Sequence, residues 1–145
     1  MQLSRDILFF VSTLGWFNGV ILAVYLIFFF KKRTLATQLL GWMILALSLR
    51  VFKSVVWWFT PSLPTIYIQY GIVACMFVGP LLYAYLQASA HGYTRLPRSW
   101  AITLMVYTLI ALVLLLLFTA SQHIPLWKYY IIPAIYYLWF VYILL

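Results

Sequence analysis

The chain has 145 residues, of which 68% are hydrophobic and only 7% are charged, whereas soluble domains contain about 45–50% apolar and about 25% charged residues. This composition excludes an ordinary water-soluble domain and predicts an all-α, polytopic bundle of transmembrane helices. The chain has nine lysine and arginine residues and a single acid, Asp6, which gives a formal charge of +8. Because most of these cations lie at the ends of apolar runs, they indicate membrane topology and contact with anionic lipid headgroups rather than binding of nucleic acid.

Five apolar runs follow one another along the chain, and each is interpreted as a membrane-crossing helix, because a crossing needs about 20 apolar residues. The spans are expected at residues 7–30, 35–59, 66–86, 100–119 and 129–145, and the last is barely long enough. None shows the alternating polarity of a β-barrel strand. The first run is too long for a signal-peptide core of about 7–15 residues. Residues 1–145 are therefore expected to form one transmembrane domain without a soluble domain.

The short connections between these runs predict the orientation of the chain. The loops on one side of the membrane carry five cations: Lys31, Lys32, Arg33, Arg95 and Arg98. Those on the other side carry two, Arg5 and Lys128. Positively charged loops stay in the cytoplasm. We therefore expect a bacterial inner-membrane protein with its N-terminus outside and its C-terminus in the cytoplasm.

Arg50 and Lys53 lie inside the second run, one helical turn apart. A cation at the centre of a membrane helix costs about 2.5–3.5 kcal/mol on insertion scales, so such residues usually face a bundle interior or a cavity. Asn18 lies at a similar depth in the first run and is the expected partner of Arg50; Asp6 is the expected counter-ion of Lys53. Two interpretations stay open, an anion-accepting pocket that opens to the outer half of the membrane and a pair of snorkelling anchors.

The first run contains a G-x-x-x-G pattern at Gly15 and Gly19. Small residues at this spacing let two helix backbones approach closely. The pattern favours packing against another helix of the same chain over a homodimer face, and both remain open.

The third run carries small residues at four-residue steps, Gly71, Cys75 and Gly79, and Pro80 follows directly. Proline removes an amide donor and clashes one turn back, so it should bend the helix. Neighbouring helices must then satisfy the freed carbonyl, which predicts that this helix lies at the centre of the bundle. The bend is interpreted as a static kink in preference to a hinge.

The last run is dense in aromatic residues between positions 129 and 142. They could line a pocket for an apolar ligand, but a wall that faces lipid or a partner is the favoured interpretation. Catalysis finds little support, because Asp6 is the only acid and His91 and His123 are expected on opposite sides of the membrane. We expect no enzyme, no metal site and no cofactor.

Residues 79–85 read G-P-L-L-Y-A-Y. This stretch resembles the N-terminal membrane region of bacterial AraC-type transcription regulators that carry a multi-helix sensor, and residues 3–30 and 32–50 resemble the first two helices of that region. The likeness covers roughly residues 3–100, departs from the family pattern at Thr37 and Gln38, and weakens after Pro97. It implies a cytoplasmic helix-turn-helix domain that follows the membrane region and binds DNA, so residues 1–145 themselves should not contact nucleic acid.

These features predict a sensory, signal-transducing membrane region. A ligand or lipid would enter near Arg50, Lys53 and Asn18 and would bias two packings of the bundle around Gly79 and Pro80. Its partners would be the bilayer and either a second copy or a larger membrane protein. The alternative is a small, non-catalytic structural or accessory subunit of an inner-membrane complex.

Overall fold

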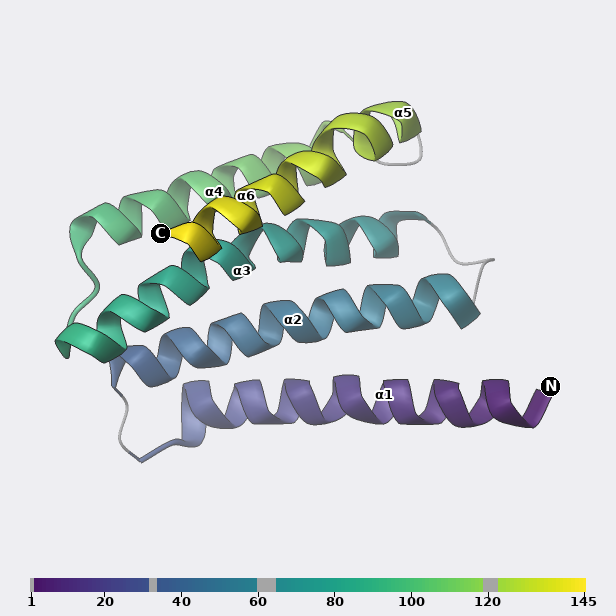
Figure 1. Cartoon of the computed structure of the whole chain (residues 1–145), viewed down its shortest axis with the longest axis horizontal. Helices are drawn as coiled ribbons and strands as arrows, with labels where there is room; N and C mark the ends of the chain where they lie inside the picture. Colours follow the sequence, from purple (N-terminus) through teal and green to yellow (C-terminus); the bar gives the residue numbers. More distant parts are fainter. Residues whose placement is uncertain (1, 32–33, 60–64, 119–122) are drawn as a thin grey trace.

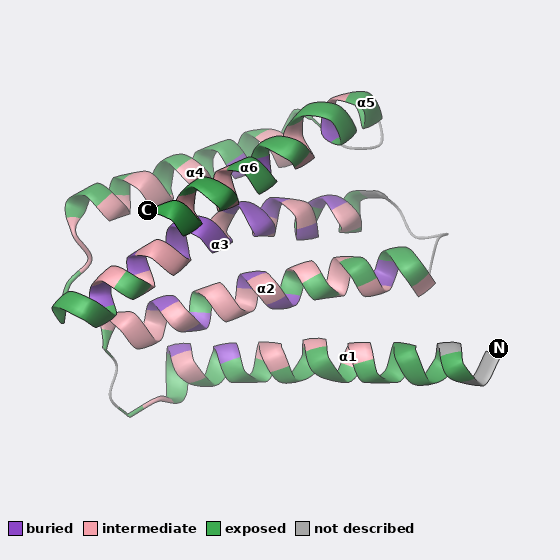
Figure 2. Ribbon diagram, in the orientation of Figure 1, coloured by how far each residue is buried: buried purple, intermediate pink, exposed green. Residues whose placement is uncertain are grey.

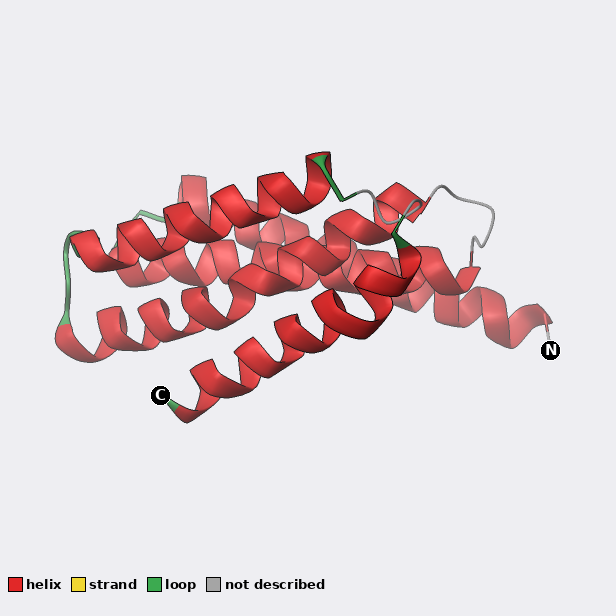
Figure 3. Ribbon diagram, turned by 90° about the horizontal axis from the view of Figure 1, so that it is seen from above, coloured by secondary structure: helices red, strands yellow, loops and turns green. Residues whose placement is uncertain are grey.

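The computed structural model describes residues 2–31, 34–59, 65–118 and 123–145, which form a helical bundle (Figure 1). No described residue lies in a strand (Figure 3), and the predicted all-α fold is confirmed. Four helices are long and apolar enough to cross a membrane. They are α1 (Gln2–Val24) with its π-helical continuation η1 (Tyr25–Phe29), α2 (Leu35–Phe59), α3 (Thr65–His91) and α4 (Arg98–Leu116).

The C-terminal stretch, predicted as the fifth span, is helical from Ile124 to Leu144 and is divided by a π turn; it is not among the four helices above. It consists of α5 (Ile124–Leu126), the π-helical turn η2 (Trp127–Ile131) and α6 (Ile132–Leu144). The three segments follow one another without a gap, so the fifth span stays a prediction. Pro133 explains the division, since its nitrogen cannot donate to the carbonyl one turn earlier and the wider π turn before it absorbs the mismatch.

Local signals set the ends of the long helices. The hydroxyl oxygen of Thr34 accepts a hydrogen bond from the amide of Thr37 at 3.2 Å, which caps the first turn of α2. Gly92 has a φ of +64° directly after the last residue of α3, the left-handed conformation that commonly ends a helix. Lys32 and Arg33, two of the cations used to predict topology, lie outside the described residues, as does the side chain of Arg5.

Helix α3 is the centre of the bundle, as the sequence predicted. Helices α2, α4 and α6 all pack against it, whereas within the described ranges α1 contacts only α2 and its own continuation η1. Buried positions concentrate on α3, and the side of α1 that faces away from α2 is exposed (Figure 2). Two buried clusters join α3 to its neighbours: Val73, Cys75, Met76, Ala111, Trp127 and Ile135 in one, and Leu39, Leu81, Ala84 and Ala88 in the other.

Candidate functional site

Arg50 lies on α2 and reaches the aromatic face of α6. Its guanidinium carbon is 4.7 Å from the ring centroid of Trp139 and 5.6 Å from that of Tyr136. Both distances fall within the roughly 6 Å of a cation–π contact, which contributes about 0.5–1 kcal/mol when exposed and about 2 kcal/mol when desolvated. The side chain is half-buried, and no acid lies beside it among the described residues. The rings of Trp139 and Tyr136 therefore shelter this cation, and we call the arrangement the Arg50 contact.

Small residues of α3 line the junction between α2 and α6. A β-carbon on Gly71 would collide with the β-carbon of Lys53 and would lie 3.0 Å from the carbonyl oxygen of Leu49. One turn later, the buried Cys75 donates its thiol hydrogen to the carbonyl of Gly71 at 3.2 Å. The carbonyl of Cys75 accepts the indole N–H of Trp139 at 2.6 Å. Trp139 thus binds α3 through its nitrogen and α2 through its ring face.

The other polar residues predicted for the site lie elsewhere. Lys53 is half-buried with its stem against α3, while Asn18 and Asp6 are exposed on α1. The expected pairs of Asn18 with Arg50 and of Asp6 with Lys53 do not form. Helix α1 meets α2 through Gly19, and the adjacent Asn18 is turned by about 100° from that face.

Arg50 also borders a groove of about 890 Å³ between α1 and α2. Ser12 and Gly15 line it from α1 and Ser54 lines it from α2, together with apolar side chains. The hydroxyl of Ser54 donates to the carbonyl of Arg50 at 3.3 Å. Lys53 does not line this groove, so the two cations do not share one pocket.

The two glycines of the G-x-x-x-G pattern have different surroundings. A β-carbon on Gly19 would collide with the hydroxyl oxygen of Ser48 on α2, whereas nothing lies within 4 Å of the corresponding position on Gly15. Gly19 therefore serves a close approach of α1 to α2. Gly15 lies on the same face of α1 and lines the groove toward α2, so the homodimer interpretation stays untested.

Pro80 lies within α3, and the axis of this helix changes direction part-way along its length (Figure 1). A β-carbon on Gly79 would lie 3.0 Å from the ring of Tyr142, so this glycine lets α6 approach the bend. The hydroxyl of Tyr142 accepts a hydrogen bond of 3.4 Å from Tyr107 of α4. The small-residue stripe of α3 thus meets α2 at Gly71 and α6 at Gly79.

Gln69 is a polar residue that the sequence analysis missed. It is completely buried on α3, and its amide nitrogen donates to the carbonyls of Leu114 at 2.9 Å and Phe118 at 3.3 Å. The indole of Trp127 donates to the same Phe118 carbonyl at 2.7 Å. These donors satisfy carbonyls that the end of α4 leaves free. The signal was present, since an amide side chain inside an apolar span usually bonds across helices.

The aromatic residues near the C-terminus divide between two roles. Four of them are between 59% and 73% exposed: Tyr129, Tyr130, Tyr137 and Phe140. They form the outward wall that the sequence favoured. Trp139 and Tyr142 are half-buried and contact α3, so these two rings hold the C-terminal stretch on the bundle.

Within the described ranges, no three His, Cys, Asp or Glu side chains gather where they could hold a metal ion. Comparisons with protein-family models, with curated proteins and with solved structures find no match to this chain. The resemblance to AraC-type regulators stays a prediction from residues 3–100.

Proposed function

We propose that this bundle is a membrane-embedded signal-transducing region in which the Arg50 contact couples α2 to the C-terminal stretch. The observation that carries the proposal is the guanidinium held 4.7 Å from the Trp139 ring. A cation within an apolar span is costly, and such residues usually serve a function. Here the cation is held by a ring on α6, a helix that does not otherwise pack against α2.

The contact has the properties of a two-state element. Arg50 lies over the rings of α6 and also borders the groove between α1 and α2. An anionic ligand in that groove would compete with the rings for the guanidinium, because charge-assisted hydrogen bonds are stronger than a cation–π contact. A ligand shifts such an equilibrium only by its differential affinity for the two states.

Release of Arg50 would change the position of the C-terminal stretch on α3. The carbonyl bond from Trp139 and the approach of Tyr142 to Gly79 hold this stretch beside the bend at Pro80. Under the orientation predicted from the loop cations, the chain leaves the membrane on the cytoplasmic side of a bacterial inner membrane. The AraC resemblance would place a DNA-binding domain there, so the movement would alter how two such domains are presented to DNA.

The test is transcript profiling of cells that express the protein from its complete reading frame. We expect Arg50→Leu to shift the profile toward that of the deletion strain or toward constant activation. Arg50→Lys should shift it less, because a lysine keeps the charge. Lys128→Leu is the control, since it also removes a cation, but one that lies over Tyr129 and does not line the groove. A profile of Arg50→Leu identical to that of the wild type would remove Arg50 from signalling.

A second candidate is an accessory subunit of a larger inner-membrane complex. It is favoured by the exposed aromatic wall near the C-terminus and by the unpartnered side of α1, where Phe10 is 67% exposed. Purification from native membranes in a mild detergent separates the two proposals. A larger membrane protein recovered in stoichiometric amount would support the subunit role.

A further inference from the structure

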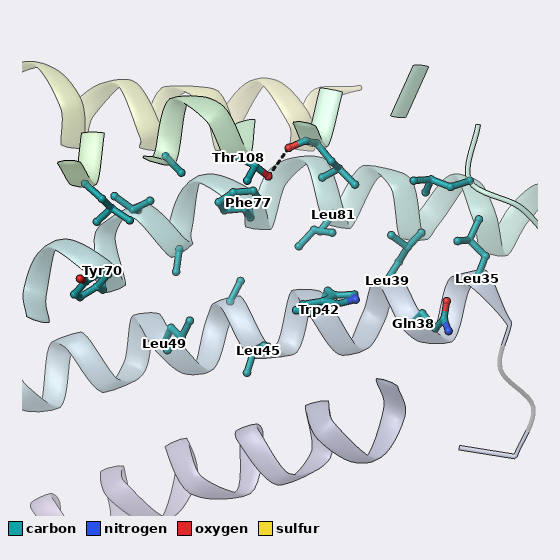
Figure 4. Close-up of a pocket in the computed structure, with 17 residues that line it drawn as sticks. Leu35, Gln38, Leu39, Trp42, Leu45, Leu49, Tyr70, Phe77, Leu81 and Thr108 are labelled. Carbon is teal, nitrogen blue, oxygen red and sulfur yellow. Dashed lines mark hydrogen bonds between the residues drawn. The ribbon is translucent and has the colours of Figure 1, made fainter. Parts of the chain in front are cut away.

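A second groove lies on the opposite side of α3 from the Arg50 contact. It has a volume of about 860 Å³ and runs between α2 and α4, with α3 as its floor (Figure 4). Its lining is almost entirely apolar and includes five buried residues from the three helices: Leu39, Ala46, Val73, Leu81 and Ala111. No contact between α2 and α4 closes it.

The groove has the length of a lipid chain. Its lining on α2 extends from Leu35 to Leu49, which at 1.5 Å per residue is about 21 Å. The hydrocarbon of one leaflet is about 15 Å thick, half of the roughly 30 Å of a bilayer core. An acyl chain that enters at one end can therefore lie along the groove for the full depth of its leaflet.

Two arginines neighbour one mouth of the groove in the chain. Leu96 lines this mouth, and Arg95 and Arg98 flank Leu96 in the chain. Both arginines are exposed, and neither forms an ion pair in the described part of the chain. Leu35 and Gln38 line the same end from α2 (Figure 4).

We infer that this groove binds an anionic phospholipid, with an acyl chain between α2 and α4 and the phosphate at Arg95 and Arg98. The charge of the mouth selects the headgroup, because basic pockets between transmembrane helices on the cytoplasmic side bind anionic lipids. The only acid of the chain, Asp6, lies near the other end of the bundle, on the first turns of α1. No acidic side chain therefore competes with a phosphate at this mouth.

The recessed floor favours a chain of lipid over a helix. The five buried lining residues are only 4–7% exposed, so an occupant has to be narrow to reach them. A helix is about 10–12 Å across with its side chains and would rest on the rims formed by α2 and α4. The inference is independent of the Arg50 contact, which lies on another face of α3.

The experiment counts lipids bound to the purified full chain by native mass spectrometry. The chain is incubated in detergent with dioleoyl phosphatidylglycerol or with dioleoyl phosphatidylcholine. We expect one preferred phosphatidylglycerol site, weakened about 10- to 30-fold by the double variant Arg95→Ala/Arg98→Ala, since each cation near a membrane surface contributes about 1 kcal/mol, a factor of up to about five. The double variant Arg5→Ala/Lys128→Ala is the control, because it removes the same charge from the other end.

A second pair of variants tests the groove itself. Ala74 lines it, and Ala74→Leu should reduce phosphatidylglycerol binding, whereas Ala134→Leu on the exposed side of α6 should not. Equal binding of the two lipids, or full binding by the Arg95→Ala/Arg98→Ala variant, would overturn the inference. A disulfide-linked dimer of Ala74→Cys in native membranes would also overturn it, because a second copy would then occupy the groove.

Discussion

The contact of Arg50 with Trp139 is open to a direct energetic test by a double-mutant cycle. Arg50→Met keeps most of the apolar stem and removes the charge. Trp139→Leu removes the ring and the indole bond to the carbonyl of Cys75. The lost indole bond is common to Trp139→Leu and to the double variant, so it cancels in the cycle, and only the pair term between residues 50 and 139 remains.

The geometry sets the size of this term. The guanidinium carbon is 4.7 Å from the ring centroid of Trp139, and the side chain is half-buried. A contact between the exposed and the desolvated limits contributes about 1–2 kcal/mol. Tyr136 lies 5.6 Å from the same guanidinium carbon and still attracts it in the Trp139→Leu variant. We therefore expect a coupling energy near the lower value, about 1 kcal/mol.

The assay is unfolding of the chain in dodecyl maltoside by added sodium dodecyl sulfate, followed by far-ultraviolet circular dichroism. Lys128→Met replaces Arg50→Met in the control cycle, because Lys128 lies over Tyr129 and is far along the helix from Trp139. The control pair should be additive within about 0.3–0.5 kcal/mol. A coupling for Arg50 and Trp139 no larger than that of the control would refute the cation–π explanation for the position of Arg50.

Two further predictions concern packing and buried polarity. Gly71→Ala should destabilise the bundle by about 1–3 kcal/mol, because the new β-carbon meets Lys53 and overpacking forces a shift of the backbone. Gly15→Ala should be neutral or stabilising by up to about 1 kcal/mol, because nothing lies close to the new β-carbon there. Gln69→Leu should cost about 1–3 kcal/mol, since it leaves the Leu114 carbonyl without the donor observed here, while the Phe118 carbonyl keeps its bond from Trp127. The same unfolding assay measures all three, and equal stabilities for the two glycine variants would contradict the packing at Gly71.

The fold was predictable because lipid imposes one requirement on every span. Backbone groups must bond within the segment, so long apolar runs become helices. The second span is the clearest case, since residues 35–59 match α2 at both ends and Thr34 supplies its cap. In the predicted fifth span, a π turn at Trp127–Ile131 precedes Pro133, and this span stays a prediction. Hydropathy alone does not register this division.

The site was predictable as a position but not as a set of contacts. Arg50 stood out because a cation inside an apolar run is costly. Its partner was assigned by depth, which selected Asn18 and ignored rotation about the helix axis. The observed partner, Trp139, lies in a run whose aromatic density suited a lipid-facing wall. Only the tertiary arrangement, with α3 between α2 and α6, distinguishes this ring from its exposed neighbours.

Helix α3 separates the two surfaces on which the proposals rest. Gly71, Cys75 and Gly79 face the junction of α2 with α6, while Val73, Phe77 and Leu81 line the groove toward α4. The second set is offset from the first by two residues, which is about 200° on a helix. A lipid in the groove therefore cannot touch the Arg50 contact, and any influence between them must pass through a change in α3 itself. Pro80 is where such a change is easiest, because the backbone bond of a regular helix is already missing there.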